Sequence, residues 1–270
     1  MHGRSLAFNT AFGAEHGRTF PYPSRCNLRR QRSHRRPQPP PAFHHYRATL
    51  RRPGGNNLVR KDVERAQALR HYQSTRVYRL SYRGFLGDRD AEMTVEVTYD
   101  SPSTKNFRVI SQTGSKAIVD HAFKRLLDSE KEAAEPEMRM RTLLNRDNYD
   151  FALVGYESSD KGNQYVLAVC PKTISKYVYR GTVWVDATDF AVTRIDAEPA
   201  QNPSFWTKKS EVHHEYMKVQ GFWLPRRNES VSYIRLGGRA TLTIEYNNYR
   251  VVNSRPSESA AKASSGAGAR

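Results

Sequence analysis

Apolar and polar side chains alternate with a two-residue period along the middle part of this chain. Residues 78–83 alternate Tyr and Leu with Arg and Ser, residues 93–99 alternate Met, Val and Tyr with Thr and Glu, and residues 107–111 continue the pattern. Successive side chains of a β-strand point to opposite faces, so the pattern predicts three strands, each with one apolar face. A short turn at residues 87–90 joins the first two, which favours antiparallel pairing.

Turn signals separate a further series of apolar runs. Residues 159–163 and the pair Gly237-Gly238 have the composition of hairpin loops. Because the runs follow one another through turns rather than through helices, a parallel α/β fold is disfavoured. The further predicted strands are residues 151–156, 164–170, 176–186, 191–197, 211–219, 222–224, 229–236 and 239–249.

Two segments have a helical period instead. Apolar residues recur at three-residue spacing from Val63 to Tyr72 and predict a short first helix. Residues 116–134 carry an apolar stripe opposite a charged face, which predicts an amphipathic helix that ends before Pro136. Residues 137–148 are charged and fit either another helical turn or a loop. The stripe consists of Ile118, Val119, Ala122, Phe123, Leu126 and Leu127.

These elements predict a mainly β fold of the α+β class. About eleven consecutive strands must bury their apolar faces, and a curved antiparallel sheet with helices on its concave face does so. We therefore expect a curved sheet, or unclosed β-barrel, with the 116–134 helix as a lid. Residues 59–252 form the expected β domain.

The two ends of the chain have a different composition. Residues 1–60 contain twelve Arg and one acid, or +11 of the total net charge of +17, so the rest carries about +6. We expect residues 1–58 to be a disordered basic leader rich in Pro and Arg, and residues 253–270 to be a disordered tail. The leader is either a polybasic arm for nucleic acid or anionic lipid, or a non-native extension from an early start site.

The cysteines, the apolar runs and the first residues bear on the cellular compartment of the protein. Cys26 falls in the leader and Cys170 in a predicted strand, so we expect Cys170 to be a buried apolar residue rather than half of a disulfide. No run of eighteen apolar residues predicts a transmembrane helix. The first residues show no convincing signal peptide, because Asn9 and Thr10 interrupt the apolar run after Arg4.

A search for catalytic and metal-binding patterns favours a protein that is not an enzyme and has no cofactor or metal. His213 and His214 are adjacent on a predicted strand and so point to opposite faces, which prevents joint chelation and favours a solvated strand. Asp186 and Asp189 fit a turn in which their carboxylates accept backbone N–H groups. Residues 228–230 match a glycosylation acceptor, a pattern that is frequent by chance.

The aromatic content raises one alternative. The chain has 15 Tyr, 11 Phe and 3 Trp, and Tyr177, Tyr179 and Arg180 lie together in one predicted strand. Aromatic rings interleaved with Arg can stack on single-stranded nucleic acid. Aromatic residues also favour strands for packing reasons, and the domain is only mildly basic, so we expect no specific nucleic-acid partner.

Residues 179–186 form a strand with an aromatic-x-Asp ending, and residues 190–195 follow with an apolar-x-Arg-Ile pattern. This arrangement resembles the bacterial outer-membrane lipoprotein-sorting proteins, the LolA/LolB-type carriers. Residues 199–206 and 222–225 are similar to an uncharacterised branch of that superfamily, and the resemblance covers about residues 60–250. It implies an unclosed barrel of about eleven strands with a helical lid, a periplasmic location, bound acyl chains, and neither cofactor nor catalysis.

The leading hypothesis is thus a monomeric binding or carrier protein of the bacterial envelope for an apolar ligand, either a lipid or a lipoprotein acyl chain, with envelope proteins as further partners. The alternatives are nucleic-acid or anionic-surface binding through the leader, and a structural envelope protein without a ligand. Each proposed lining residue is equally compatible with ordinary core packing. The proposed lining residues are Val95, Val97, Phe107, Val109, Phe123, Leu126, Leu127, Val183, Val185, Leu242 and Ile244.

Overall fold

The computed structural model describes residues 57–252, except for Leu86, residues 102–103, Ala117, residues 160–161, Trp206 and Leu236. The expectations for the basic leader and for the tail fall on residues that lie outside this described part of the chain. The described chain begins in helix α2, Asn57–Ala68, two residues before the expected start of the β domain at residue 59.

The described residues form one antiparallel sheet of ten strands. The order β3-β2-β1-β10-β9-β8-β7-β6-β5-β4 leaves β3 and β4 as unpaired edges, so the sheet is not closed. Apart from β1 and β10, every pair of neighbours is also consecutive in sequence, as the turn signals predict. The strands are β1 His71–Arg83, β2 Arg89–Asp100, β3 Thr104–Gly114, β4 Tyr149–Ser159, β5 Gly162–Pro171, β6 Tyr179–Asp186, β7 Val192–Pro199, β8 Thr207–Val219, β9 Phe222–Ile234 and β10 Arg239–Val252.

The expected number of strands was one too high, because two predicted strands are one. β9 runs without a break from Phe222 to Ile234 and includes Pro225. Pro lacks an N–H and is normally confined to bulges or edges of a sheet. Here the β8–β9 pairing has a register shift: Glu215 pairs with Arg227 and the next residue, Tyr216, pairs with Pro225, so β9 has one extra residue at Arg226. This irregularity accommodates the proline within the strand.

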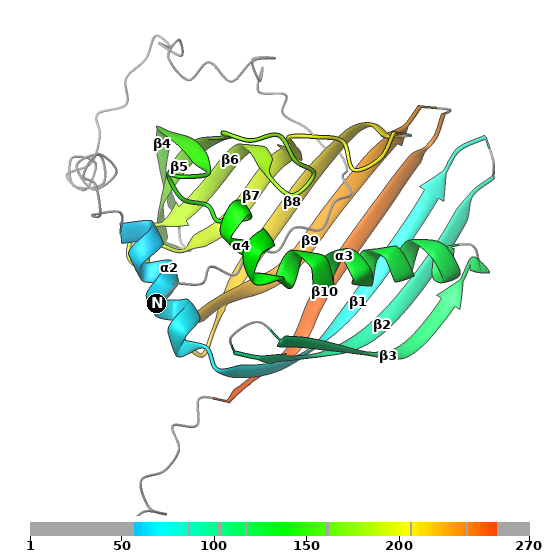
Figure 1. Ribbon diagram of the computed structural model, residues 1–270, viewed down its shortest axis with the longest axis horizontal. Helices are drawn as coiled ribbons and strands as arrows, with labels where there is room; N and C mark the ends of the chain where they lie inside the picture. The colour runs from blue at the N-terminus through cyan, green and yellow to red at the C-terminus, as the bar shows by residue number, and fades with distance from the viewer. Residues whose placement is uncertain are drawn as a thin grey trace, which may run out of the picture.

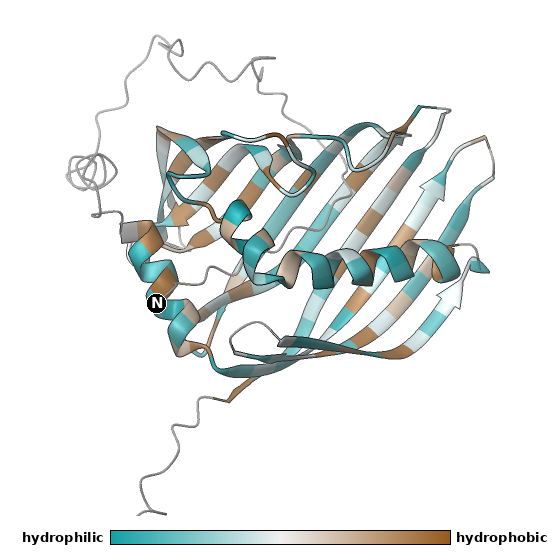
Figure 2. Ribbon diagram, in the orientation of Figure 1, coloured by the Kyte–Doolittle hydropathy of each residue, from teal (hydrophilic) through white to brown (hydrophobic). Residues whose placement is uncertain are grey.

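The apolar faces of the strands point to the inside of the curved sheet. In β2, Met93, Val95 and Val97 are fully buried, whereas Thr94 and Glu96 between them are partly exposed. Figure 2 shows the same alternation as bands of hydrophobic and hydrophilic residues along the strands. The alternation of the sequence therefore separates an inner face from an outer, polar face, as expected.

Three helical segments lie between the edge strands and pack on the inner face. Figure 1 shows them as one continuous crossing of the sheet in front of its strands. They are η1 Ile118–Phe123, a π-helix, followed by α3 Lys124–Ala134 and α4 Pro136–Thr142. The amphipathic helix and its end before Pro136 are thereby confirmed, and the charged residues after Pro136 form a further helix.

The first helix lies earlier in the chain than its period indicates. α2 ends at Ala68, and Tyr72 already belongs to β1. Tyr72 is nevertheless buried, as is Leu69. The apolar spacing thus marked buried residues correctly, but it extended the helix into residues that pair with β2 and β10.

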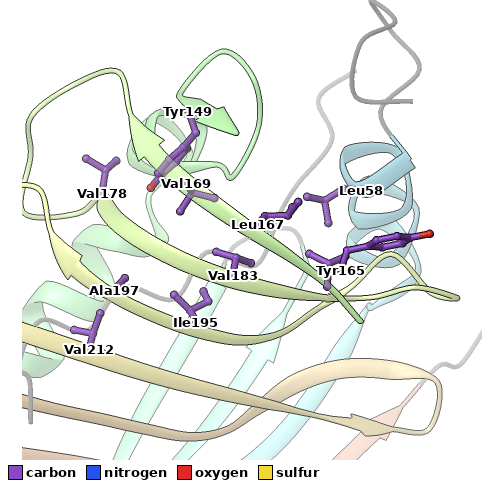
Figure 3. Packing of buried hydrophobic residues seen from close by; sticks show 11 residues of the cluster. Leu58, Tyr149, Tyr165, Leu167, Val169, Val178, Val183, Ile195, Ala197 and Val212 are labelled. Carbon is purple, nitrogen blue, oxygen red and sulfur yellow. The ribbon is translucent and has the colours of Figure 1, made fainter. Parts of the chain in front are cut away.

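The core consists of separate groups of buried side chains. One group unites β1, β2 and β10 with η1 and α3, and we call it the lid cluster. A second group belongs to β4–β8 and includes Leu58 of α2, which Figure 3 shows beside the strand residues of this group. The buried members of the lid cluster are Tyr78, Ala91, Met93, Val95, Val97, Ile118, Phe123, Leu126, Leu242, Ile244 and Tyr246.

Candidate functional site beneath the crossing helices

Most of the proposed lining residues lie together in the lid cluster. Phe123 at the end of η1 is fully buried, and Leu126 of α3 is nearly so. They face strand residues of β1, β2 and β10, and Phe107 and Leu127 pack against the same group. The members that the sequence had proposed are Val95, Val97, Phe107, Phe123, Leu126, Leu127, Leu242 and Ile244.

The other three proposed residues lie elsewhere. Val183 and Val185 of β6 are fully buried, but they belong to the second core group under β4–β8. Val109 lies on the edge strand β3 and is 43% exposed. The structure therefore does not bring these three side chains to the lid cluster, and the sequence pattern could not show which strands the helix covers.

A buried ion pair joins the crossing helix to the sheet. Arg76 of β1 and Glu130 of α3 are 1% and 4% exposed, and their Nη1 and Oε2 atoms are 2.5 Å apart. The hydroxyl of Tyr78 donates to the other oxygen of Glu130 at 2.8 Å. The carboxylate of Glu130 thus receives one hydrogen bond from each of two neighbouring inward positions of β1, and we call these three residues the latch.

Aromatic rings surround the cation of the latch. The guanidinium carbon of Arg76 is 4.9 Å from the ring centroid of Tyr246 and 5.8 Å from that of Phe107. Such contacts favour a cation, and more so where water is excluded. Burial acts to lower the pKa of Arg76, but the carboxylate of Glu130 raises the pKa well above its usual value. Arg76 is therefore a fixed charge.

Burial also shifts the pKa values of the neighbouring hydroxyl of Tyr78 and amine of Lys105. It raises the pKa of Tyr78 well above its usual value, and the charge of Glu130 adds to that effect, so Tyr78 remains a donor. It lowers the pKa of Lys105 on β3 to about 7, with Arg76 as the next cause. Arg139 of α4, which is buried, contributes to the same lowering. The inner face under the helices therefore contains ionisable side chains as well as aliphatic ones.

Sequence reasoning missed the latch, although part of its signal was present. Arg76 stands at an inward position of β1, two residues from Tyr78, so its burial followed from the alternation. Glu130 lies four residues after Leu126 on the apolar stripe of the helix. Their pairing depends on how the helix crosses the sheet, which no local pattern contains.

The adjacent histidines of β8 do point to opposite faces, as expected, but only one is near solvent. His213 on the outer face contacts Asp196 and Glu215. His214 on the inner face is 4% exposed, and burial lowers its pKa to about 4. The interpretation as a solvated strand was therefore wrong for His214. Its neighbour Asn228 is also buried and donates to the hydroxyl of Tyr246 at 2.8 Å, so the glycosylation pattern lies in the interior.

The paired carboxylates of the β6–β7 turn have structural partners. Asp186 accepts the backbone N–H groups of Thr188 and Asp189 at 2.9 and 2.6 Å, as a turn residue does. Asp189 instead binds the side chains of Lys218 and Trp223, at 2.6 and 2.8 Å. The first carboxylate fits the prediction, and the second joins the turn to β8 and β9.

The aromatic pair proposed for stacking on nucleic acid belongs to the core. Tyr177 is 6% exposed, and the partly buried ring of Tyr179 packs against Tyr149 at 5.7 Å. Neither ring forms an open platform.

Cys170 at the end of β5 differs from its expectation. It is buried, but it is disulfide-bonded rather than unpaired. The only other cysteine of the chain is Cys26, which lies outside the described residues. The expectation of an unpaired thiol was therefore wrong.

Two searches of the described residues bear on other classes of protein. Among residues 57–252, apart from the gaps given above, no three His, Cys, Asp or Glu side chains lie close enough to hold a metal ion. In the same part of the chain, no helix is both long and apolar enough to cross a membrane.

Together, the fold and the site define an open antiparallel half-barrel whose inner face is crossed by helices. No protein-family model matches the chain, and neither does any curated protein. Solved structures with similar folds include a DUF1329 family protein from Desulfovibrio piger, with 15% identity and a TM-score of 0.38 over 76% of this chain and 92% of that one.

Two further similar structures carry names from the superfamily that the sequence resembles. An outer membrane lipoprotein-sorting protein domain from Vibrio parahaemolyticus has 11% identity and a TM-score of 0.34, over 76% of this chain and 96% of that one. A LolA superfamily protein from Nitrosomonas europaea has 11% identity and a TM-score of 0.29, over 71% and 92%. Lipoprotein-sorting and LolA superfamily proteins are thus among the structures to which this chain is similar.

Proposed function

We propose that this protein is a non-enzymatic binding or carrier protein for an apolar ligand in the bacterial envelope. The ligand is a lipid or a lipoprotein acyl chain, and it takes the inner face of the sheet in place of η1 and α3. The protein acts as a monomer on a lipid or a lipoprotein, and other envelope proteins hand the ligand on. Residues 59–252 carry this function, between the leader and the tail.

The observation that carries the proposal is the composition of the helix–sheet contact. The buried contact consists largely of aliphatic and aromatic side chains, with the ion pair Arg76–Glu130 among them. An apolar ligand gains roughly 0.8 kcal/mol for each CH₂ group removed from water, so an acyl chain of about a dozen carbons can replace the contacts of the helix. A buried ion pair adds little net stability, because desolvation offsets its attraction. An acyl chain can therefore replace the apolar part of the helix–sheet contact.

The charges of the site fit binding rather than catalysis. Glu130 is occupied by two donors, Arg76 and Tyr78. Tyr78 is held in its protonated form by burial and by the charge of Glu130, which prevents it from acting as a base near neutral pH. These groups orient one another, and they give the closed position of α3 a defined geometry.

The bonded state of Cys170 supports an envelope location. Disulfides persist in oxidising compartments such as the periplasm and are rare where thiols are kept reduced. Since Cys170 is disulfide-bonded, we infer an oxidising compartment for the folded protein.

The test is native mass spectrometry of the full chain purified from bacteria, with extraction of any bound lipid and titration with a fluorescent fatty acid. We expect co-purified lipid, or saturable uptake of the fatty acid by lipid-stripped protein. A protein that carries no lipid and fails to bind the probe contradicts the proposal. Binding of nucleic acid that disappears with salt and with deletion of residues 1–58 would instead favour the leader as the functional part.

A matched pair of variants connects the ligand to the latch. Glu130→Gln removes the charge that holds α3 against Arg76, whereas Asp128→Asn changes an exposed carboxylate on the same helix. A larger open fraction raises apparent affinity in proportion, so Glu130→Gln should bind the probe about five- to thirtyfold more tightly. Asp128→Asn should bind as the parent does. Equal affinities for the two variants would exclude the latch from ligand uptake.

A further inference from the structure

Because neighbouring strands are antiparallel, four of the connections between strands lie at the same end of the strands, and this end is one side of the sheet. We call their described residues the loop rim. Figure 1 shows two of them, the β1–β2 hairpin in cyan and the β9–β10 hairpin in orange, projecting together from this edge. The rim comprises residues 84–85 and 87–88 (β1–β2), 172–178 (β5–β6), 200–205 (β7–β8), and 235 and 237–238 (β9–β10).

The three most exposed large apolar side chains of the described residues all lie on the loop rim. Ile174 is 81% exposed, Phe205 is 77% exposed and Phe85 is 68% exposed. Each belongs to a different loop. Single exposed apolar residues need no explanation, but three at one edge, on three loops, indicate a surface that contacts something. The remaining exposed apolar residues, which lie on β3, β4, α4 and the end of β10, reach at most 51%.

Cations accompany these side chains. Among its described residues the rim has Lys172, Lys176 and Arg235 against the one carboxylate of Asp88, a net charge of +2. The Nε of Arg235 donates to the carbonyl of Phe205 at 2.7 Å, and its guanidinium carbon is 5.5 Å from the Phe205 ring centroid. This contact fixes a cation beside an exposed ring and joins the β7–β8 loop to the β9–β10 hairpin.

The remaining contacts of the loop rim leave its three exposed apolar side chains at the surface. The ring of Phe85 lies beside Gly237, so the β1–β2 and β9–β10 hairpins touch. Lys172 donates to the carbonyl of Arg146, and Lys176 lies 3.7 Å from Glu132 of α3. Lys176 is thus partly neutralised. Lys172 and Arg235 donate to carbonyl groups, and among the described residues neither forms an ion pair.

We propose that the loop rim docks on an anionic lipid membrane, with Phe85, Ile174 and Phe205 entering the interface. Apolar side chains on separate tips with basic residues between them fit the boundary between headgroups and acyl chains, where cations meet anionic lipid and apolar groups leave water. The crossing helices join β3 and β4 at this same edge, so docking places both ends of the lid segment next to the membrane.

The test uses the full chain and sedimentation with vesicles of phosphatidylcholine, with and without phosphatidylglycerol. The variant Phe85→Ser/Ile174→Ser/Phe205→Ser should lower partitioning to the anionic vesicles at least about tenfold, because three side chains no longer leave water. The matched control Ile110→Ser/Val154→Ser/Val252→Ser removes three apolar side chains that are 51%, 50% and 48% exposed, away from the rim, and should bind as the parent does.

Residues 1–60, with twelve Arg and one acid, can also attract anionic vesicles, so a local readout is needed. An environment-sensitive dye on Ile174→Cys should brighten and shift to the blue on anionic vesicles, while the same dye on Val154→Cys should not change. The two dye positions separate insertion of the rim from attraction by the leader, because a protein held by its leader alone would leave both dyes in water. A parent that does not bind vesicles, a triple rim variant that binds within twofold of the parent, or a dye at position 174 that stays in water overturns the proposal.

Discussion

The two faces of the sheet contain the same kinds of charged residue in different surroundings. On the outer face, Arg79 of β1 is 46% exposed and binds Glu92 and Glu245 of the neighbouring strands at 2.7 and 2.8 Å. On the inner face, Arg76 of the same strand is 1% exposed and binds Glu130 of the helix. The outer pairs follow from strand register alone, whereas the inner pair joins two layers. The exposed ion pairs therefore join neighbouring strands on the surface of the sheet, whereas the buried pair joins the helix to the sheet.

The histidines of β8 repeat this contrast one residue apart. The hydrogen bond of His213 to Asp196 raises the pKa of His213, against the effect of partial burial. Burial lowers the pKa of His214 to about 4, and the nearby His213 acts in the same direction. Two identical side chains thus have opposite shifts, because one face of the strand has carboxylates and the other lacks water.

Loss of the inner carboxylate should have the largest effect on stability. Glu130→Ala leaves Arg76 buried without its carboxylate, and breaking such a pair costs about 3–5 kcal/mol. Glu245→Ala on the outer face should cost no more than about 1 kcal/mol, as is usual for exposed pairs. Urea denaturation of both variants measures the difference. Equal losses would mean that the inner pair is as solvated as the outer one.

Truncation of an apolar side chain on the inner face should have the next largest effect on stability. Leu242 is 2% exposed in the lid cluster, so Leu242→Ala should lower the free energy of unfolding by about 2–5 kcal/mol. Val109 on the edge strand is 43% exposed, and Val109→Ala should stay within about 0.5 kcal/mol of the parent. A large loss at Val109, measured in the same urea series, would show that β3 is covered by contacts that its exposure does not reveal.

Acid should destabilise the protein through His214. Its pKa is about 4 when folded and 6.5 for the unfolded reference, so the unfolded state binds a proton first as the pH falls. Its contribution is present above pH 6.5 and lost between about pH 6.5 and 4, which amounts to roughly 3 kcal/mol. His214→Gln should remove this part of the pH dependence. Parallel stability–pH curves for the variant and the parent would contradict the assignment.

His213 should give a smaller effect of the opposite sign. Because its folded pKa is raised, its contribution is present below pH 6.5 and is lost as the pH rises through the folded value. His213→Gln should therefore lose stability at pH 6 relative to pH 8, by up to about 1 kcal/mol for such a partly exposed pair. Thermal unfolding of the two histidine variants at both pH values measures the signs side by side, and a larger loss at pH 8 would contradict this one.

Much of this fold could be predicted from the sequence, because the period of the apolar residues is a local property. The strands around Val95, the hairpin at Gly237-Gly238 and the helix that ends before Pro136 follow from it. The continuity of β9 through Pro225 could not be predicted, since it depends on a register shift in the β8–β9 pairing. Local sequence patterns contain no information about which strands pair with each other or in which register.

The candidate site likewise has a part that the sequence predicts and a part that it does not. The inward apolar residues of β2 and β10 were found because alternation predicts burial. Val183 was assigned to the same site although β6 lies on the far half of the sheet, because periodicity gives the face but not the position across it. The Arg76–Glu130 pair spans 54 residues and connects a strand to a crossing helix, so only the assembled structure shows it.

In the proposed function, η1 and α3 are a cover that a ligand displaces. Amide hydrogen exchange of the full chain, with and without a saturating fatty acid, tests it most directly. The claim predicts that the ligand accelerates exchange in residues 118–134 while the paired strands β1 and β10 keep their protection. Unchanged or slower exchange in residues 118–134, with the fatty acid bound, would contradict it.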